Sequence, residues 1–178
     1  MRIIAGMAKG RKLDTPKSGT RPMTGRARES VFSILGIRLA DATVLDLFAG
    51  SGSLGLESLS RGAESAVFVE KSASACEVIE SNIERVGLGG LVVSSSVSAF
   101  LTGRVGAFDI VFVDPPYHSS DEDVENELVS IERVLATGGL IVLHRQARST
   151  VKVPTFLRTV DERRYGDAVI TMIERKQA

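Results

Sequence analysis

The sequence predicts a doubly wound α/β fold, because short apolar runs alternate along the chain with segments of helical periodicity. A glycine-rich turn lies between the first apolar run and the helix after it, as in nucleotide-binding folds of this class. Near the C-terminus, two alternating runs joined at Gly166-Asp167 predict an antiparallel pair of strands. At 178 residues, the chain is long enough for one such domain with a full core.

The expected elements follow one another in regular order. Thr24 is expected to cap a first helix, whose apolar face holds Ala27, Val31, Ile34 and Leu35. A helix over 74–86 is closed by Gly87, and another, opened by the capping-box spacing of Ser119 and Glu122, runs to about Leu135. The first expected strand ends at residues 44–45. The other expected strands are residues 66–70, 91–95, 108–113, 140–143, 157–164 and 168–174.

The composition predicts an ordinary globular protein of a reducing compartment. Hydrophobic residues make up 43% of the chain and charged residues 25%. A single cysteine, Cys76, excludes an internal disulfide framework, and no apolar run reaches the ~18 residues of a membrane span. The N-terminus lacks a signal-peptide core, so we expect a cytoplasmic protein, and we expect it to be a monomer. With two histidines and one cysteine, no metal site of the His/Cys type is expected.

Positive charge is concentrated in residues 1–38, which we interpret as a basic N-terminal extension formed by a short hairpin and a helix. This stretch holds nine Lys or Arg against two acids, a net charge of +7, whereas the remaining residues carry −7. Such asymmetry favours a polyanionic partner, although a solvated basic face without a partner is the alternative. The candidate RNA contacts are Arg2, Lys9, Arg11, Lys12, Arg21, Arg26 and Arg28. Arg26 and Arg28 lie off the apolar stripe of the helix and are expected to remain available to solvent or ligand.

The glycine-rich turn belongs to the stretch Val44–Glu57, VLDLFAGSGSLGLE, around which the chain is organised. A G-x-G-x-x-G between a strand and a helix is typical of a nucleotide site, because glycine lets backbone and ligand approach closely. Asp46, four residues before the first glycine, makes the prediction more specific. A carboxylate there would repel a pyrophosphate but suits a ligand with a cationic amine, such as S-adenosylmethionine. Candidate cofactor contacts in this stretch are Asp46, Phe48, Ala49, Gly50, Ser51 and Gly52.

Two further acidic features have different interpretations. Glu70 ends the second expected strand, where an acid can bind both hydroxyls of a ribose. The acids Asp121, Asp123, Glu125 and Glu127 are spaced like a metal cluster, but a solvated helix start favoured by the helix dipole is the preferred interpretation.

The second chemical motif is Asp114-Pro115-Pro116-Tyr117, directly after the fourth strand. Ligands of open α/β sheets bind at the carboxyl ends of strands, so this motif is expected beside the glycine-rich turn. The Asp114 side chain and the Pro115 carbonyl can accept hydrogen bonds from an exocyclic amine, and Tyr117 offers a face for a flipped base. The motif therefore predicts methyl transfer to an amino group of a base.

With these motifs the chain resembles the RsmD family, the guanine-N2 methyltransferases of 16S ribosomal RNA. The resemblance is carried by Arg2-Ile-Ile-Ala-Gly, Lys9-Gly-Arg-Lys-Leu, Arg21-Pro22, Arg26 to Glu29, Val44 to Glu57, Glu70, Asp114 to Tyr117 and Tyr165-Gly-Asp. It implies a seven-stranded methyltransferase sheet over residues 39–178, S-adenosylmethionine as donor, and the ribosomal RNA or small ribosomal subunit as partner. The chain departs from the family pattern at Met23, Gly25 and Ser96; Ser96 stands where an acid often contacts the donor's adenine, with Val97 as the neighbouring contact.

The expected mechanism is direct displacement on the sulfonium methyl. Most of the reduction in the activation barrier is expected to come from the alignment of amine, methyl carbon and sulfur. Two alternatives remain open. A DNA exocyclic-amine methyltransferase would use the same tetrapeptide, but 178 residues leave little room for a target-recognition domain. A non-catalytic RNA-binding assembly factor would retain the donor site only as a relic.

Overall fold

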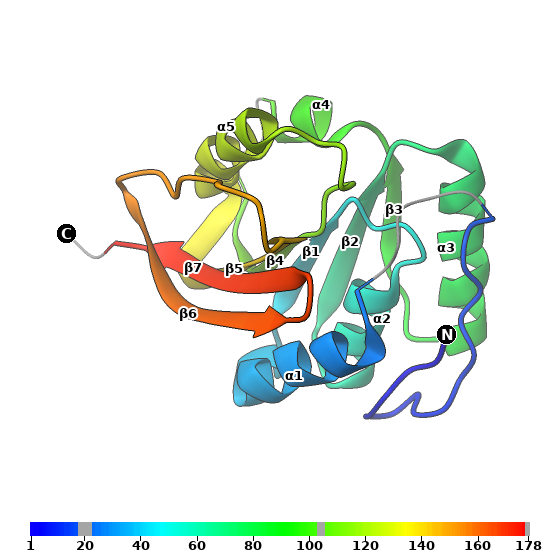
Figure 1. Cartoon of the computed structure of the whole chain (residues 1–178). Helices are drawn as coiled ribbons and strands as arrows, with labels where there is room; N and C mark the ends of the chain where they lie inside the picture. Colours follow the sequence, from blue (N-terminus) through cyan, green and yellow to red (C-terminus); the bar gives the residue numbers. More distant parts are fainter. Residues whose placement is uncertain (18–22, 103–105, 177–178) are drawn as a thin grey trace.

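The computed structural model describes residues 1–17, 23–102 and 106–176. A seven-stranded sheet runs through it in the order β3-β2-β1-β4-β5-β7-β6 (Figure 1). The strands are β1 (Thr43–Leu47), β2 (Ser65–Glu70), β3 (Leu91–Ser94), β4 (Phe108–Val113), β5 (Leu135–Gln146), β6 (Leu157–Tyr165) and β7 (Ala168–Arg175). The first five are parallel, and β7 pairs antiparallel with β5 and β6. The predicted doubly wound α/β fold and its antiparallel last pair are confirmed.

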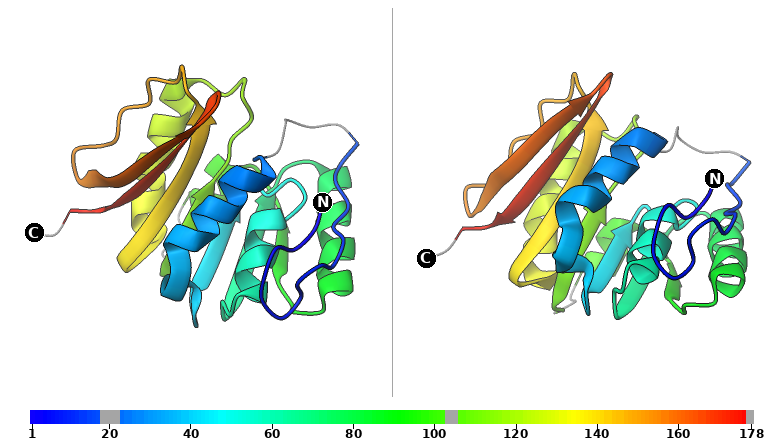
Figure 2. Two further views of the ribbon diagram at one scale, coloured as in Figure 1. Left: turned by 60° about the horizontal axis from the view of Figure 1, so that its bottom comes forward. Right: turned by 90° about the horizontal axis from the view of Figure 1, so that it is seen from below.

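Helices cover both faces of the sheet (Figure 2). The helices are α1 (Gly25–Leu35), η1 (Gly36–Leu39), α2 (Ser53–Ser60), α3 (Ala73–Val86), α4 (Val97–Leu101), α5 (Asp121–Ile131) and η2 (Glu132–Val134). Apolar side chains of α1, α2 and α3 pack in the core on one face, and those of α4 and α5 pack on the other. Within the described ranges, none of these helices combines the length and apolar character needed to cross a membrane.

Alternation along the strands assigns each side chain to one of these two cores. On β1, Val44 packs with the α1–α3 side and Leu45 with the α4–α5 side. The sheet order reverses direction at β1, which has β2 on one side and β4 on the other. A crevice forms at the carboxyl ends of strands where the order reverses, and the site lies there.

The structure differs from the expected elements mainly around α5. Ser120, not Ser119, caps this helix, since its Oγ accepts a hydrogen bond from the Asp123 amide at 3.0 Å. The helix ends at Ile131, and the chain enters β5 at Leu135, so the fifth strand is longer than predicted. The short helix α4 was not predicted, because five residues give too little periodicity.

The first 13 residues form two antiparallel arms joined by one isolated bridge between Arg2 and Lys12. This N-terminal hairpin (residues 1–13) is docked on α2. The amides of Ile4 and Ala5 donate to the Glu57 carboxylate at 2.7 and 3.0 Å, and the Met7 amide donates to the Ser60 carbonyl at 2.7 Å. The hairpin therefore contributes to the core of the domain, whereas the role of residues 1–38 as a separate RNA-contacting extension stays a prediction.

Candidate active site

The turn after β1 is held by a backbone hydrogen bond to β2 and by side chains of α3. Phe48, Gly50 and Gly52 have φ of 59°, 57° and 73°, and the Ala49 amide donates to the Val69 carbonyl at 3.1 Å. A Cβ on Gly52 would lie 3.1 Å from Ile79, and one on Gly55 would lie 2.3 Å from the Phe68 ring. Only glycine allows the turn and the start of α2 to pack this closely on the sheet.

Asp46 is the buried acid at the carboxyl end of β1. Its side chain is 1% exposed, and its Oδ2 accepts a hydrogen bond from the Gly55 amide at 2.9 Å. Burial, with smaller contributions from the nearby carboxylates of Asp114 and Glu70, raises the pKa of Asp46 to about 8 against the opposing effect of the Gly55 hydrogen bond. The Asp46 side chain thus lies near two other acids, and a cationic ligand group beside it would favour its ionised form and lower its pKa.

Glu70 ends β2 and connects it to the glycine-rich turn. Its Oε2 accepts from the Gly50 amide at 3.0 Å, and its Oε1 accepts from the Ser72 amide at 2.8 Å. These two bonds fix the orientation of the carboxylate at the edge of the cavity.

One cavity of about 1050 Å³ joins these groups to the motif after β4. Of the predicted site residues, those lining it are Asp46, Phe48, Ala49, Gly50, Ser51, Glu70, Ser96, Val97, Asp114 and Pro116. Gly52, Pro115 and Tyr117, which were also predicted as site residues, do not line it. Thr15, Pro16, Lys17 and Met23, which sequence reasoning did not assign to this cavity, also line it.

Asp114 presents a partly exposed carboxylate to the cavity, with 24% of its side chain accessible. Its Oδ1 lies 2.6 Å from Nδ1 of His144, a side chain at the end of β5 that is only 2% exposed. The Tyr117 ring centroid lies 6.3 Å from that of His144 at an interplanar angle of 55°. The Pro116 carbonyl closes the loop by accepting from the Ser119 amide at 2.9 Å.

His144 is the neighbour of the motif that sequence reasoning did not identify. Its signal was the strand order. In the parallel pair of β4 and β5, Val113 is level with Leu143, so Asp114, which follows β4, lies beside His144 of β5. Only the register, which a single sequence does not give, brings them into contact.

Ser96, the residue at the expected adenine contact, is the N-cap of α4. Its Oγ accepts a hydrogen bond from the Ala99 amide at 3.2 Å, and Val97 beside it is buried. Ser95 is anchored by its amide to the Glu70 carbonyl at 2.9 Å, so this wall of the cavity is attached to β2.

The acids of α5 are less solvated than expected. Asp121 accepts from the Ser149 hydroxyl at 2.6 Å and from Nη2 of Arg145 at 3.0 Å. These bonds, together with the Thr150 amide, hold the pKa of Asp121 well below its usual range. Glu127 has a buried Oε2 without a partner, and burial raises its pKa to about 7. Among the described residues, no group of three or more His, Cys, Asp or Glu is arranged to hold a metal ion.

The basic residues of the N-terminal segment divide into exposed and buried ones. Arg2, Lys9, Arg11, Lys12 and Arg26 are exposed, while Arg21 lies outside the described residues. Arg11 also donates to the Arg85 and Val86 carbonyls at the end of α3.

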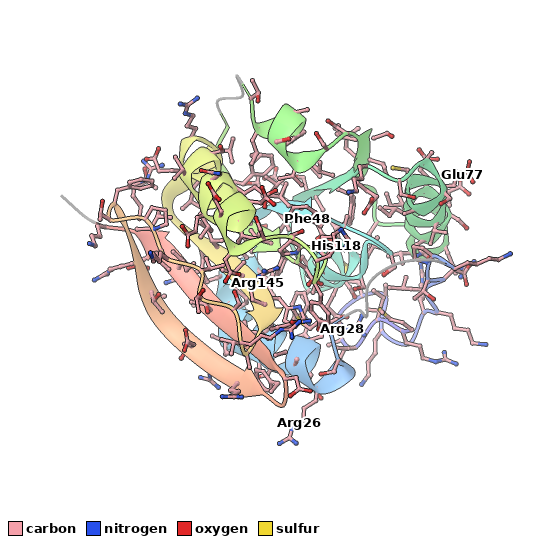
Figure 3. All side chains as sticks on the ribbon, turned by 45° about the horizontal axis from the view of Figure 1, so that its top comes forward. Arg26, Arg28, Phe48, Glu77, His118 and Arg145 are labelled. Carbon is pink, nitrogen blue, oxygen red and sulfur yellow. The ribbon has the colours of Figure 1, made fainter. Side chains whose placement is uncertain are left out.

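The expectation that Arg28 stays available to solvent or ligand is wrong. Arg28 is 5% exposed, and its Nη2 donates to the carbonyl of Arg2 in the N-terminal hairpin at 2.7 Å. Burial lowers the pKa of Arg28, against the opposing effect of Glu57. Figure 3 shows the contrast: Arg26 projects away from the end of α1, and Arg28 lies among the packed elements.

This sheet order, with an antiparallel β7, a glycine-rich turn after β1 and acids ending β1 and β2, defines the class of Rossmann-like methyltransferase folds. The chain belongs to the family described as Conserved hypothetical protein 95, whose model matches residues 1–174.

The named relatives and solved structures agree with this assignment. The chain is 44% identical to the Ribosomal RNA small subunit methyltransferase D of Escherichia coli over 119 residues, which are 66% of this chain and 60% of that protein. With the protein of the same name from Haemophilus influenzae it is 31% identical over 172 residues, 93% of this chain and 89% of that one. A solved Escherichia coli structure, described as the candidate methyltransferase yhhF, superposes on this chain with a TM-score of 0.88 at 33% sequence identity. The alignment covers 100% of this chain and 99% of that one.

Proposed function

We propose that this protein transfers a methyl group from S-adenosylmethionine to the exocyclic N2 amine of a guanine in 16S ribosomal RNA. The observation that carries the proposal is the single cavity in which the carboxylates of Asp46 and Glu70 meet the Asp114 carboxylate. The first two suit a cationic donor that carries a ribose, and the third suits an amine as acceptor. The names of the Escherichia coli and Haemophilus influenzae relatives support small-subunit ribosomal RNA as the substrate.

The residues at the carboxyl ends of β1 and β2 fit the donor. Asp46 is a buried carboxylate suited to an ammonium group, and Glu70 is held in one orientation by two backbone amides. Gly52 and Gly55 let the turn and the start of α2 pack closely against Ile79 and Phe68. S-adenosylmethionine, when bound, supplies a methyl group that its sulfonium makes electrophilic. A solved methyltransferase at 16% identity, described as a complex with SAH, shares this fold.

The Asp114 loop would bind and orient the substrate. Because His144 engages Oδ1 of Asp114, Oδ2 is the oxygen left to accept a proton of the guanine amine, together with the Pro115 carbonyl. The amine's lone pair is delocalised into the ring, and these bonds would favour a geometry in which it is more nucleophilic. Tyr117, partly exposed beside the cavity, would stack on a base that has left its helix. Most of the rate enhancement would come from alignment.

The exposed bases of the N-terminal segment would contact RNA phosphates, since a net charge of +7 over residues 1–38 has no evident use for a small substrate. Residues 1–38 would then act as the RNA-contacting extension of a methyltransferase domain formed by 39–178. A cytoplasmic monomer that works on ribosomal RNA or on the small subunit is the state we propose.

The test is a methyl-transfer assay with labelled donor on naked ribosomal RNA, assembled small subunits and DNA, followed by nucleoside analysis. The proposal expects label in N2-methylguanosine from one of the two ribosomal substrates. Label in DNA alone would favour the exocyclic-amine methyltransferase of DNA, and RNA binding without transfer would favour an assembly factor.

A further inference from the structure

We infer that His144 is a positioning residue for Asp114, which fixes one carboxylate oxygen so that the other faces the substrate amine. The inference deepens the proposed function and rests on it for the identity of the amine. The hydrogen bond itself is a property of the fold.

The geometry identifies the donor. An ionised carboxylate only accepts hydrogen bonds, so the 2.6 Å contact requires a proton on Nδ1 of His144. His144 is 2% exposed, and Asp114 is 24% exposed. The bond therefore ties a buried, ordered group to one that reaches the cavity.

Asp114 is the exposed member of the pair, and hydration favours a carboxylate that turns outward into solvent. The hydrogen bond from His144 opposes that rotation and holds the carboxylate beside the cavity that Asp114 lines.

The imidazole has little freedom of its own. It stands on β5 opposite Ile170 of β7, on the same face as the buried Val142, and Tyr117 lies against it. The next residue, Arg145, points to the other face and holds the same loop by donating from Nη2 to the Ser119 carbonyl at 2.9 Å. Adjacent β5 side chains thus hold residues 114–119 from both faces of the sheet.

A pair of isosteric variants separates the hydrogen bond from packing. His144→Asn retains a donor near the Nδ1 position, whereas His144→Leu has the same size without one. For His144→Leu we expect kcat on the RNA substrate to fall about 10- to 100-fold, the scale of a misplaced catalytic group, with KM for RNA and donor affinity within about 2-fold. His144→Asn should recover most of kcat. Equal loss in both variants, or full kcat in His144→Leu, would overturn the inference.

A second measurement does not depend on turnover. Nitrogen-15 NMR of the wild-type imidazole should show a proton on Nδ1, and Asp114→Ala should change that signal. An imidazole protonated only on Nε2 would overturn the positioning role. Should wild type methylate no RNA while the Nδ1 proton is present, the proposed substrate fails and the His144–Asp114 pair stands.

Discussion

The Gly50 amide donates to Oε2 of Glu70 at 3.0 Å, so the acid that ends β2 also holds the glycine-rich turn after β1. Its other oxygen accepts from the Ser72 amide at 2.8 Å and orients the chain leading into α3. One carboxylate thus links the two parts of the candidate donor site, and its loss affects both the ligand contact and the shape of the turn.

We therefore expect Glu70→Ala to weaken S-adenosylmethionine binding by about 1–3 kcal/mol, the scale for leaving polar groups unpaired. Calorimetry with the donor alone measures this. Glu70→Gln, which keeps one oxygen acceptor, should lose less. Tight binding of NAD by the wild type without binding of the methyl donor would refute the assignment of this site.

Asp46 should make the free energy of unfolding fall as the pH rises, whereas most carboxyl groups have the opposite effect. Its folded-state pKa of about 8 lies above the ordinary value of 3.8, so the folded protein holds a proton that the unfolded chain releases. The stability contributed by the neutral acid is fully present below about pH 4 and is lost as the pH rises through about 8. Asp46→Asn should remove this loss in urea unfolding measured across that range. The exposed Asp167→Asn is the control, and an unchanged pH slope in Asp46→Asn would contradict the burial argument.

Gly6 tests the docking of the N-terminal hairpin. Its φ is +82°, and a Cβ there would lie 1.7 Å from the Ser60 carbonyl oxygen. Gly10 has a φ of +84° with no atom within 4 Å of its added Cβ, so Gly10→Ala carries the backbone strain alone, about 1–2 kcal/mol. Gly6→Ala should be clearly less stable than Gly10→Ala in thermal or urea unfolding. Equal stability of the two variants would mean that the hairpin is not docked on α2 as described.

The exposed bases of the hairpin should determine RNA affinity. We expect Lys9→Glu with Lys12→Glu to reduce ribosomal RNA methylation strongly, with donor affinity unchanged and a shallower salt dependence of RNA binding. Arg11 is left intact in this variant because it also donates to the end of α3. Lys152→Glu with Lys176→Glu, at two exposed positions outside residues 1–38, is the charge-matched control. Full methylation and an unchanged salt slope in the hairpin variant would remove the RNA-docking role.

Local signals in the sequence predicted much of the fold and the cofactor side of the site. The glycine-rich turn, the acids ending β1 and β2, and the motif after β4 are each encoded within a few consecutive residues. Their assembly around one cavity follows from the rule that strand ends meet where the sheet order reverses.

Features that depend on register or docking were not predicted. His144 meets Asp114 only because β5 lies beside β4 in a particular register. Arg28 contacts Arg2 only because the N-terminal hairpin folds back onto the domain, and Asp121 is engaged only because the loop after β5 returns to α5. Each of these contacts joins residues that are 24 to 30 positions apart.

The most direct test of the account measures turnover and donor binding together in Asp114 and Tyr117 variants. Asp114→Ala and Tyr117→Ala should lose most RNA methylation while binding S-adenosylmethionine like the wild type, because their proposed partners are on the base. Tyr117→Phe should retain much more activity, since stacking uses the ring face. Single-turnover methyl transfer with labelled donor, alongside calorimetry of the same variants, gives both quantities. Turnover near that of the wild type in Asp114→Ala would contradict the role of this carboxylate as the acceptor of the substrate amine.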